Sequence, residues 1–175
     1  RCVKISKYGV APDGTFSALY IASNGSASSR VIHDFTVFTP AANSTYTVSC
    51  YAKSVGNDNS FSLELGTGAN NINAFFDLSN GTVTNETVSG TMTSVDASIE
   101  DVGNGWYRCI AVVVHGASWN QSTNLAFYDQ DNTDANSGIL VWAPQIEAGA
   151  FATSYIPSDT RFTSRASTAT YHDET

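Results

Sequence analysis

The chain has 175 residues, which is enough for one domain with a core of its own and marginal for two. Its net charge of −8 at pH 7 leaves no basic stripe that could follow a phosphate backbone, so we expect no nucleic-acid partner. No apolar run approaches the roughly 18 residues of a membrane span, so we expect no membrane insertion.

Short apolar or alternating segments, separated by turn residues, follow one another along the chain. Charged residues make up only 14% of the sequence, and the Ser, Thr, Asn and Gly that replace them suit strands and turns better than amphipathic helices. Strands are predicted at residues 3–6, 16–22, 30–38, 45–53, 61–65, 74–78, 98–102, 106–115, 125–128 and 138–147. About ten strands at this spacing are typical of an all-β fold, an antiparallel β-sandwich or jelly roll.

The segment 106–115, WYRCIAVVVH, is apolar on both faces of its predicted strand. A strand with one wet face would alternate between apolar and polar residues. We therefore expect a central strand with the opposing sheet against Cys109, and a loop, terminal segment or shallow groove over the face that carries Trp106. Alternation likewise puts Cys50 in the core. The outward positions of the strand at 45–53 are Thr47, Ser49, Tyr51 and Lys53.

Three cysteines, Cys2, Cys50 and Cys109, lack the close spacing that a metal cluster needs. Cys50 and Cys109 fall inside strand patterns, which favours buried free thiols. A disulfide between them requires that their strands be neighbours, which spacing alone does not tell.

The composition shows no break that would separate two folded units. We expect a single domain over residues 1–166, followed by a polar tail or linker at 167–175. Because the sequence begins abruptly inside a predicted strand, we expect it to be one module of a longer chain, with that chain's other domains as its partners.

Five segments occur in a characteristic order: GVAPDGTFSA, STYTVSCYAKS, VGNGWYRCIAVVV, SGILVWAPQIEAG and TSYIPSDTRFTSRAS. Together they resemble a jelly-roll domain common in bacteriophage and marine viral tail and head-fibre proteins, which is similar to carbohydrate-binding modules of the xylanase- and glucanase-associated type. The resemblance spans residues 10–166. It implies a polysaccharide or cell-surface glycan as partner and a location outside the cell or on the virion surface.

The chain departs from this pattern at Ala143-Pro144, where Gly-Ala is more common. Proline has no backbone N–H to donate, so the last strand should be bulged or lie at a sheet edge there.

Sugar sites combine aromatic rings with planar polar side chains that donate and accept hydrogen bonds around the ring. Trp119 lies in the polar loop HGASWNQSTN, beside Asn120 and Gln121, and is the first candidate for a ligand contact. Tyr128 and Asp129, in the following segment FYDQDNTDANSG, are candidates for the rim of the same site. The alternatives are that Trp119 folds back to cap the sandwich and that the second segment is a solvated acidic hairpin.

Outward-facing Tyr51 and Arg108 are further candidates for sugar contact if their strands line the concave sheet. Ordinary cross-strand packing is the alternative for Tyr51. The remaining tryptophans, Trp106 and Trp142, sit inside strand motifs, and we expect both to be core residues whose replacement by alanine unfolds the domain.

The resemblance also implies a structural calcium ion, because related sandwiches often carry one. Asp13, at a turn that enters a strand, and Gln145, near the far end of the chain, are the candidate ligands. Calcium takes about six to eight oxygen ligands, many of them backbone carbonyls that a sequence does not reveal. We expect no cofactor to be required.

Signals for catalysis are weak. A glycosidase needs two carboxylates placed across a cleft, and no such pair is evident in the sequence. There is also no Gly-x-Ser-x-Gly elbow, phosphate loop or zinc-binding helix motif. We therefore expect a non-catalytic carbohydrate-binding module. The alternatives are a structural virion or tail-fibre domain that binds no sugar and, third, a polysaccharide lyase or glycosidase.

Overall fold

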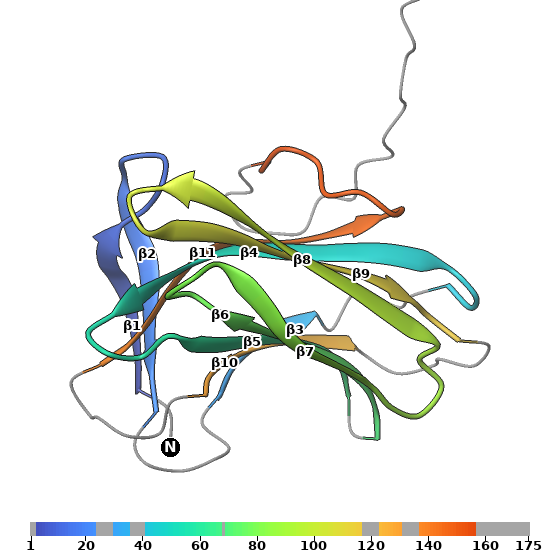
Figure 1. Cartoon of the computed structure of the whole chain (residues 1–175). Helices are drawn as coiled ribbons and strands as arrows, with labels where there is room; N and C mark the ends of the chain where they lie inside the picture. Colours follow the sequence, from blue (N-terminus) through green and yellow to red (C-terminus); the bar gives the residue numbers. More distant parts are fainter. Residues whose placement is uncertain are drawn as a thin grey trace, which may run out of the picture.

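The protein is an antiparallel β-sandwich. The computed structural model describes residues 3–23, 30–35, 41–67, 69–116, 123–130 and 137–156, which form eleven strands in two sheets packed face to face (Figure 1). These residues contain no helix, and hence none that could cross a membrane. The all-β sandwich predicted from the sequence is confirmed.

The six-stranded sheet has the order β1-β2-β11-β4-β9-β8. Its strands are β1 (Val3–Val10), β2 (Phe16–Ala22), β11 (Gly138–Ala148), β4 (Thr45–Val55), β9 (Trp106–Val114) and β8 (Ser94–Gly103). The five-stranded sheet has the order β3-β10-β5-β6-β7. Its strands are β3 (Arg30–Phe35), β10 (Thr123–Asp129), β5 (Ser60–Thr67), β6 (Asn70–Asp77) and β7 (Thr82–Val88).

One strand, β7, is absent from the sequence-based prediction. Its sequence TVTNETV is mostly polar, and all of its side chains but Val83 are exposed, because it forms an edge of the five-stranded sheet. A strand at such an edge needs no apolar face, so the apolar period that reveals the other strands is missing.

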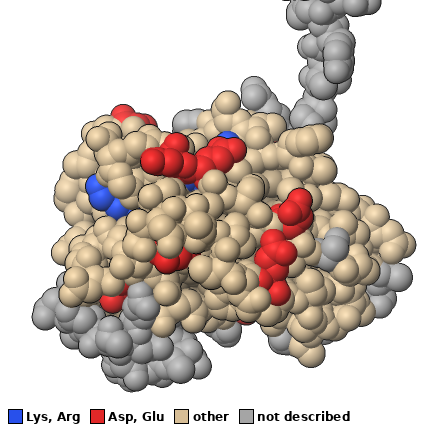
Figure 2. Space-filling view, in the orientation of Figure 1, with Lys and Arg blue, Asp and Glu red and all other residues tan. Residues whose placement is uncertain are grey.

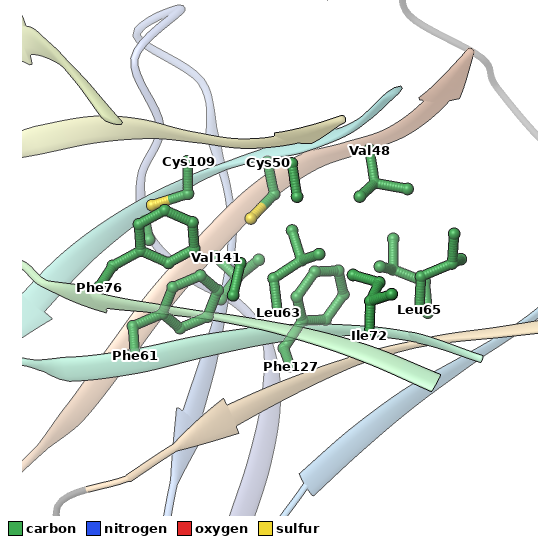
Figure 3. Packing of buried hydrophobic residues seen from close by; sticks show 14 of the residues in the cluster. Val48, Cys50, Phe61, Leu63, Leu65, Ile72, Phe76, Cys109, Phe127 and Val141 are labelled. Atoms are coloured by element: carbon green, nitrogen blue, oxygen red, sulfur yellow. The ribbon is translucent and has the colours of Figure 1, made fainter. Parts of the chain in front are cut away.

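The core lies between the two sheets. Phe61, Phe76 and Phe127 of the five-stranded sheet meet small and branched side chains of the six-stranded sheet, as Figure 3 shows. Cys50 and Cys109 lie directly opposite each other on the neighbouring strands β4 and β9. Both are fully buried free thiols with their sulfur atoms toward this core, which confirms the predicted facing of the two strands.

A second apolar cluster covers the opposite face of the six-stranded sheet. Trp106, which is 4% exposed, packs there with Tyr20 and Leu140. The segment 149–156, coloured orange to red above this sheet in Figure 1, lies over the same face. The Oγ1 of Thr47 donates to the carbonyl of Gly149 over 2.8 Å. Strand β9 is therefore apolar on both sides because a terminal segment and a second cluster cover its outer face.

Two assignments from the sequence need correction on this face. Thr47 and Ser49, predicted to point outward, do so but are buried, because the segment 149–156 covers them. Trp142, predicted to be a core residue, lies on the outer face and is only partly buried. The strand motif around Trp142 shows that it is in a sheet but not which face it occupies.

Two bulges interrupt neighbours of β2. In β11 the register breaks between Trp142 and Gln145, where Ala143 has a positive φ of 52° and Pro144 cannot donate a ladder hydrogen bond. The bulge predicted from Ala143-Pro144 is confirmed, although β11 is an interior strand. In β1 the register breaks between Ile5 and Gly9, and Lys7 has a positive φ of 55°.

Candidate functional site

The loop that carries three of the predicted sugar contacts, Trp119, Asn120 and Gln121, lies outside the described residues. Tyr128 is described and is partly exposed on β10, in register with Ser62. Asp129, predicted at the rim of the site, is 3% exposed, and its Oδ2 accepts the backbone N–H of Ser23 over 2.7 Å. A carboxylate so enclosed is part of the fold and is not offered to a ligand at the surface.

The structure does bring together the other two predicted contacts. Tyr51 on β4 and Arg108 on β9 are register partners on the outer face of the six-stranded sheet. The guanidinium carbon of Arg108 lies 5.7 Å from the centroid of the Tyr51 ring, within the range of a cation–π interaction. This pair is the starting point of the candidate site.

The Tyr51 ring belongs to a continuous set of three aromatic side chains. The Trp142 ring centroid lies 5.3 Å from that of Tyr51, its partner in the β4–β11 register, and 4.8 Å from that of Tyr155. Successive rings are tilted by 55° and 57°. All three are partly exposed. We call Tyr51, Trp142 and Tyr155 the aromatic row.

Hydrogen bonds hold the chain that supplies Tyr155. Arg108 donates from one terminal nitrogen to the carbonyl of Thr153 and lies 3.4 Å from the Oγ of Ser49. The carboxylate of Glu147 accepts the backbone N–H of Thr153 over 3.0 Å. Gln145 accepts the backbone N–H of Ile156 over 3.4 Å. Contacts on both sides of residue 155 thus fix its ring against Trp142.

On the outer face of the six-stranded sheet, positively charged side chains lie near the aromatic row and negatively charged ones lie on β8. Burial, followed by the charge of Asp13, raises the pKa of Tyr155, so its hydroxyl keeps its proton near neutral pH and remains a donor. Lys53 and Arg108 lie beside the aromatic row, and Lys53 donates to the carbonyl of Asn104 over 2.5 Å. Red side chains are prominent in Figure 2, and exposed carboxylates of the six-stranded sheet gather on β8 at Asp96, Glu100 and Asp101.

The two residues predicted as calcium ligands already have other partners. Asp13 Oδ1 accepts the backbone N–H of Thr15 over 2.9 Å and its hydroxyl over 2.7 Å. Gln145 contacts Thr153 and Ile156 through its amide. In the part of the chain that the structure describes, no three His, Cys, Asp or Glu side chains come together in a way that could hold a metal ion. Asp13 and Gln145 alone do not make a calcium site, so we assign no role to the ion.

Sequence reasoning missed Trp142 and Tyr155 as candidates. The signal for Trp142 was its place two residues before Pro144, where a bulge changes the neighbours that a side chain meets. Tyr155 lies beyond the last strand, and no local pattern shows where the chain returns. With this geometry established, comparison with known proteins adds no family: no family model matches the chain, and no curated protein matches it.

Proposed function

We propose that the protein is a non-catalytic carbohydrate-binding module that holds a polysaccharide against the aromatic row. The observation that carries this proposal is the contact of three partly exposed rings, Tyr51, Trp142 and Tyr155, on one sheet face. Apolar C–H faces of sugar rings pack on such rings, and each stacked pair adds apolar burial. The resemblance to carbohydrate-binding jelly rolls supports the same function.

The polar side chains around the aromatic row suit this role. Both hydrogen bonds of Arg108 to the protein come from one terminal nitrogen, so the N–H donors of the other terminal nitrogen remain for a glycan. Gln145 keeps one N–H and one lone pair beside its bonds to Thr153 and Ile156. Because successive rings are tilted by more than 50°, they form a stepped surface along which a twisted glycan chain fits better than a flat crystalline one. A shallow, wet surface of this kind supports affinities on the order of micromolar to millimolar.

Weak single sites suit a module of a phage or viral adhesion protein. Copies of the domain on one fibre, or further domains of a longer chain, bind a cell-surface glycan through avidity, and no single site needs to be tight. The proposal therefore places the domain outside the cell or on the virion surface.

A specific observation favours the alternative of a structural virion or tail-fibre domain. Large apolar side chains are exposed together on β1 and β2, namely Val3, Ile5, Tyr8, Val10 and Phe16. Apolar patches of this kind mark surfaces that pack against another protein. A domain used only for packing needs no sugar site.

The test is a glycan array of plant, algal and bacterial polysaccharides, followed by titration calorimetry with whichever glycan binds. Tyr51→Ala and Trp142→Ala should each weaken binding at least about tenfold, since each removes a stacking ring. Tyr128→Ala is the matched control, because Tyr128 is a partly exposed aromatic residue on the other sheet.

Trp119→Ala completes the comparison. Binding lost in Trp119→Ala and Tyr128→Ala but kept in Tyr51→Ala and Trp142→Ala would move the site to the loops first predicted from the sequence. A wild-type protein that binds nothing on a broad array would favour the structural alternative.

A further inference from the structure

A pocket opens beside the two bulges and has one residue, Trp142, in common with the aromatic row. Its volume is about 250 Å³, and it is bordered by β1, β2 and the bulged part of β11. Polar groups come from Lys4, Ser6, Lys7 and Ser17. Apolar walls come from Leu19 of β2, Phe127 of β10 and the β11 residues Val141, Trp142, Ala143 and Pro144. Small-molecule pockets usually measure about 300–1,000 Å³, so this one has room for a single sugar ring and not for a chain.

The bulge in β1 brings two lysines to one pocket. In a regular strand Lys4 and Ser6 share a face and Lys7 points to the other. Because the register breaks between Ile5 and Gly9 and Lys7 takes a left-handed backbone conformation, all three line the pocket. Bulges commonly redirect a side chain in this way, and a non-glycine residue with positive φ is found where the surroundings demand it.

A second departure from regular backbone borders the same pocket. Ala143 also has a positive φ, at the β11 bulge, and lines the pocket together with Pro144. The other described non-glycine residues with positive φ are Asn43 and Asn104, and asparagine adopts this conformation readily. The two less tolerant residues, Lys7 and Ala143, thus both lie at the pocket.

The lysines are available to a ligand. The chain has three lysines, Lys4, Lys7 and Lys53, against sixteen acidic side chains. Two of the three line this pocket, and no carboxylate of the described part of the chain forms an ion pair with either. In so acidic a protein, two unpaired cations at one concave site point to an anionic ligand.

We propose that this pocket binds one carboxylate-bearing sugar, a uronic acid unit of the glycan. The ammonium groups of Lys4 and Lys7 take the carboxylate, the hydroxyls of Ser6 and Ser17 take ring hydroxyls, and Leu19 and Pro144 pack on the apolar face. The net charge of −8 repels a polyanion, so the preferred ligand carries isolated acidic units in an otherwise neutral chain. The inference rests on the proposed function in taking the ligand to be a sugar.

The test is an amide chemical-shift titration of the 175-residue protein with sodium galacturonate, galactose and sodium acetate. Galacturonate should shift resonances of β1, β2 and the β11 bulge and saturate at millimolar concentration, while galactose and acetate should bind at least about tenfold more weakly. Lys4→Gln combined with Lys7→Gln should weaken galacturonate binding by at least the same factor. Lys53→Gln is the matched control and should bind as wild type does, because Lys53 lies on the outer face and bonds to Asn104.

Each other outcome overturns the inference. Equal binding of galactose would remove the role of the carboxylate, and equal binding of acetate would remove the role of the sugar ring. Galacturonate binding that survives in the double variant, or shifts confined to other strands, would place the anion elsewhere. The proposed function fails separately, and Tyr51 and Tyr155 distinguish the two because only Trp142 belongs to both sites. Neutral polysaccharide binding that depends on Tyr51 and Tyr155 stands even if this pocket is empty. Galacturonate binding that depends on Lys4 and Lys7 stands even if the aromatic row binds nothing.

Discussion

Replacing Trp142 by alanine should weaken polysaccharide binding at least about tenfold and leave the fold intact, whereas replacing Trp106 should unfold much of the protein. Trp106 is 4% exposed within the second apolar cluster, and truncating a buried tryptophan costs about 3–5 kcal/mol. That is a large part of a total stability of about 5–15 kcal/mol. Trp142 is partly exposed and makes two aromatic contacts, each contributing about 0.5–1.5 kcal/mol, so its loss should cost about 1–3 kcal/mol.

The assay is equilibrium urea unfolding followed by circular dichroism, run beside calorimetric titration with a bound glycan. Trp142→Phe serves as a control that keeps an aromatic ring and should retain part of the binding. If Trp142→Ala loses as much stability as Trp106→Ala, the Trp142 ring is a structural element and the aromatic row is not a binding surface. If Trp142→Ala keeps both stability and binding, the ring serves neither purpose.

Arg108→Met should release the segment around Thr153, because it removes a charge-assisted hydrogen bond of about 1.5–3 kcal/mol. Amide exchange at residues 151–156 should then accelerate while exchange in β4 stays slow, and uniform acceleration would contradict the reasoning. Cys50 and Cys109 should resist alkylation in the folded protein, because burial raises the pKa of each thiol, and should react once it unfolds in urea; rapid labelling of the native protein would refute this. His115 has its pKa lowered below 6.5 by burial, so the folded state favours the neutral ring. The unfolded state therefore binds the proton more readily, so the free energy of unfolding is unaffected above pH 6.5 and decreases as the pH falls below it. A His115→Gln variant should show a weaker pH dependence of the urea unfolding midpoint in this range.

The sandwich itself was predictable because its signals are local. Alternation in β4 assigned Cys50 to the core, and the doubly apolar β9 required cover on both faces, which the structure provides. Pro144 predicted a bulge because a missing N–H is a property of the residue alone. The polar edge strand β7 gave no such signal, since a strand whose side chains are nearly all exposed shows no alternation of apolar and polar residues.

The candidate site was harder to predict because it depends on which segments meet. Strand alternation alone made Tyr51 and Arg108 candidates for sugar contact, because it predicts that both side chains point outward. Their pairing follows from the β4–β9 register. Tyr155 joins Trp142 only because the chain turns back over the sheet after β11. Asp129 looked like a surface acid in a polar segment, and only the approach of Ser23 shows that it is enclosed.

The two edges of the six-stranded sheet carry opposite charge, which gives the domain a preferred orientation in an electric field. Lys4 and Lys7 lie on β1 at one edge, and the exposed carboxylates of Asp96, Glu100 and Asp101 lie on β8 at the other. Five inter-strand spacings of about 4.8 Å separate these edges by about 24 Å. The Debye length in physiological salt is about 8 Å, so an approaching surface senses one edge at a time. A negatively charged surface of any kind therefore turns the domain until β1 faces it, before the two come into contact.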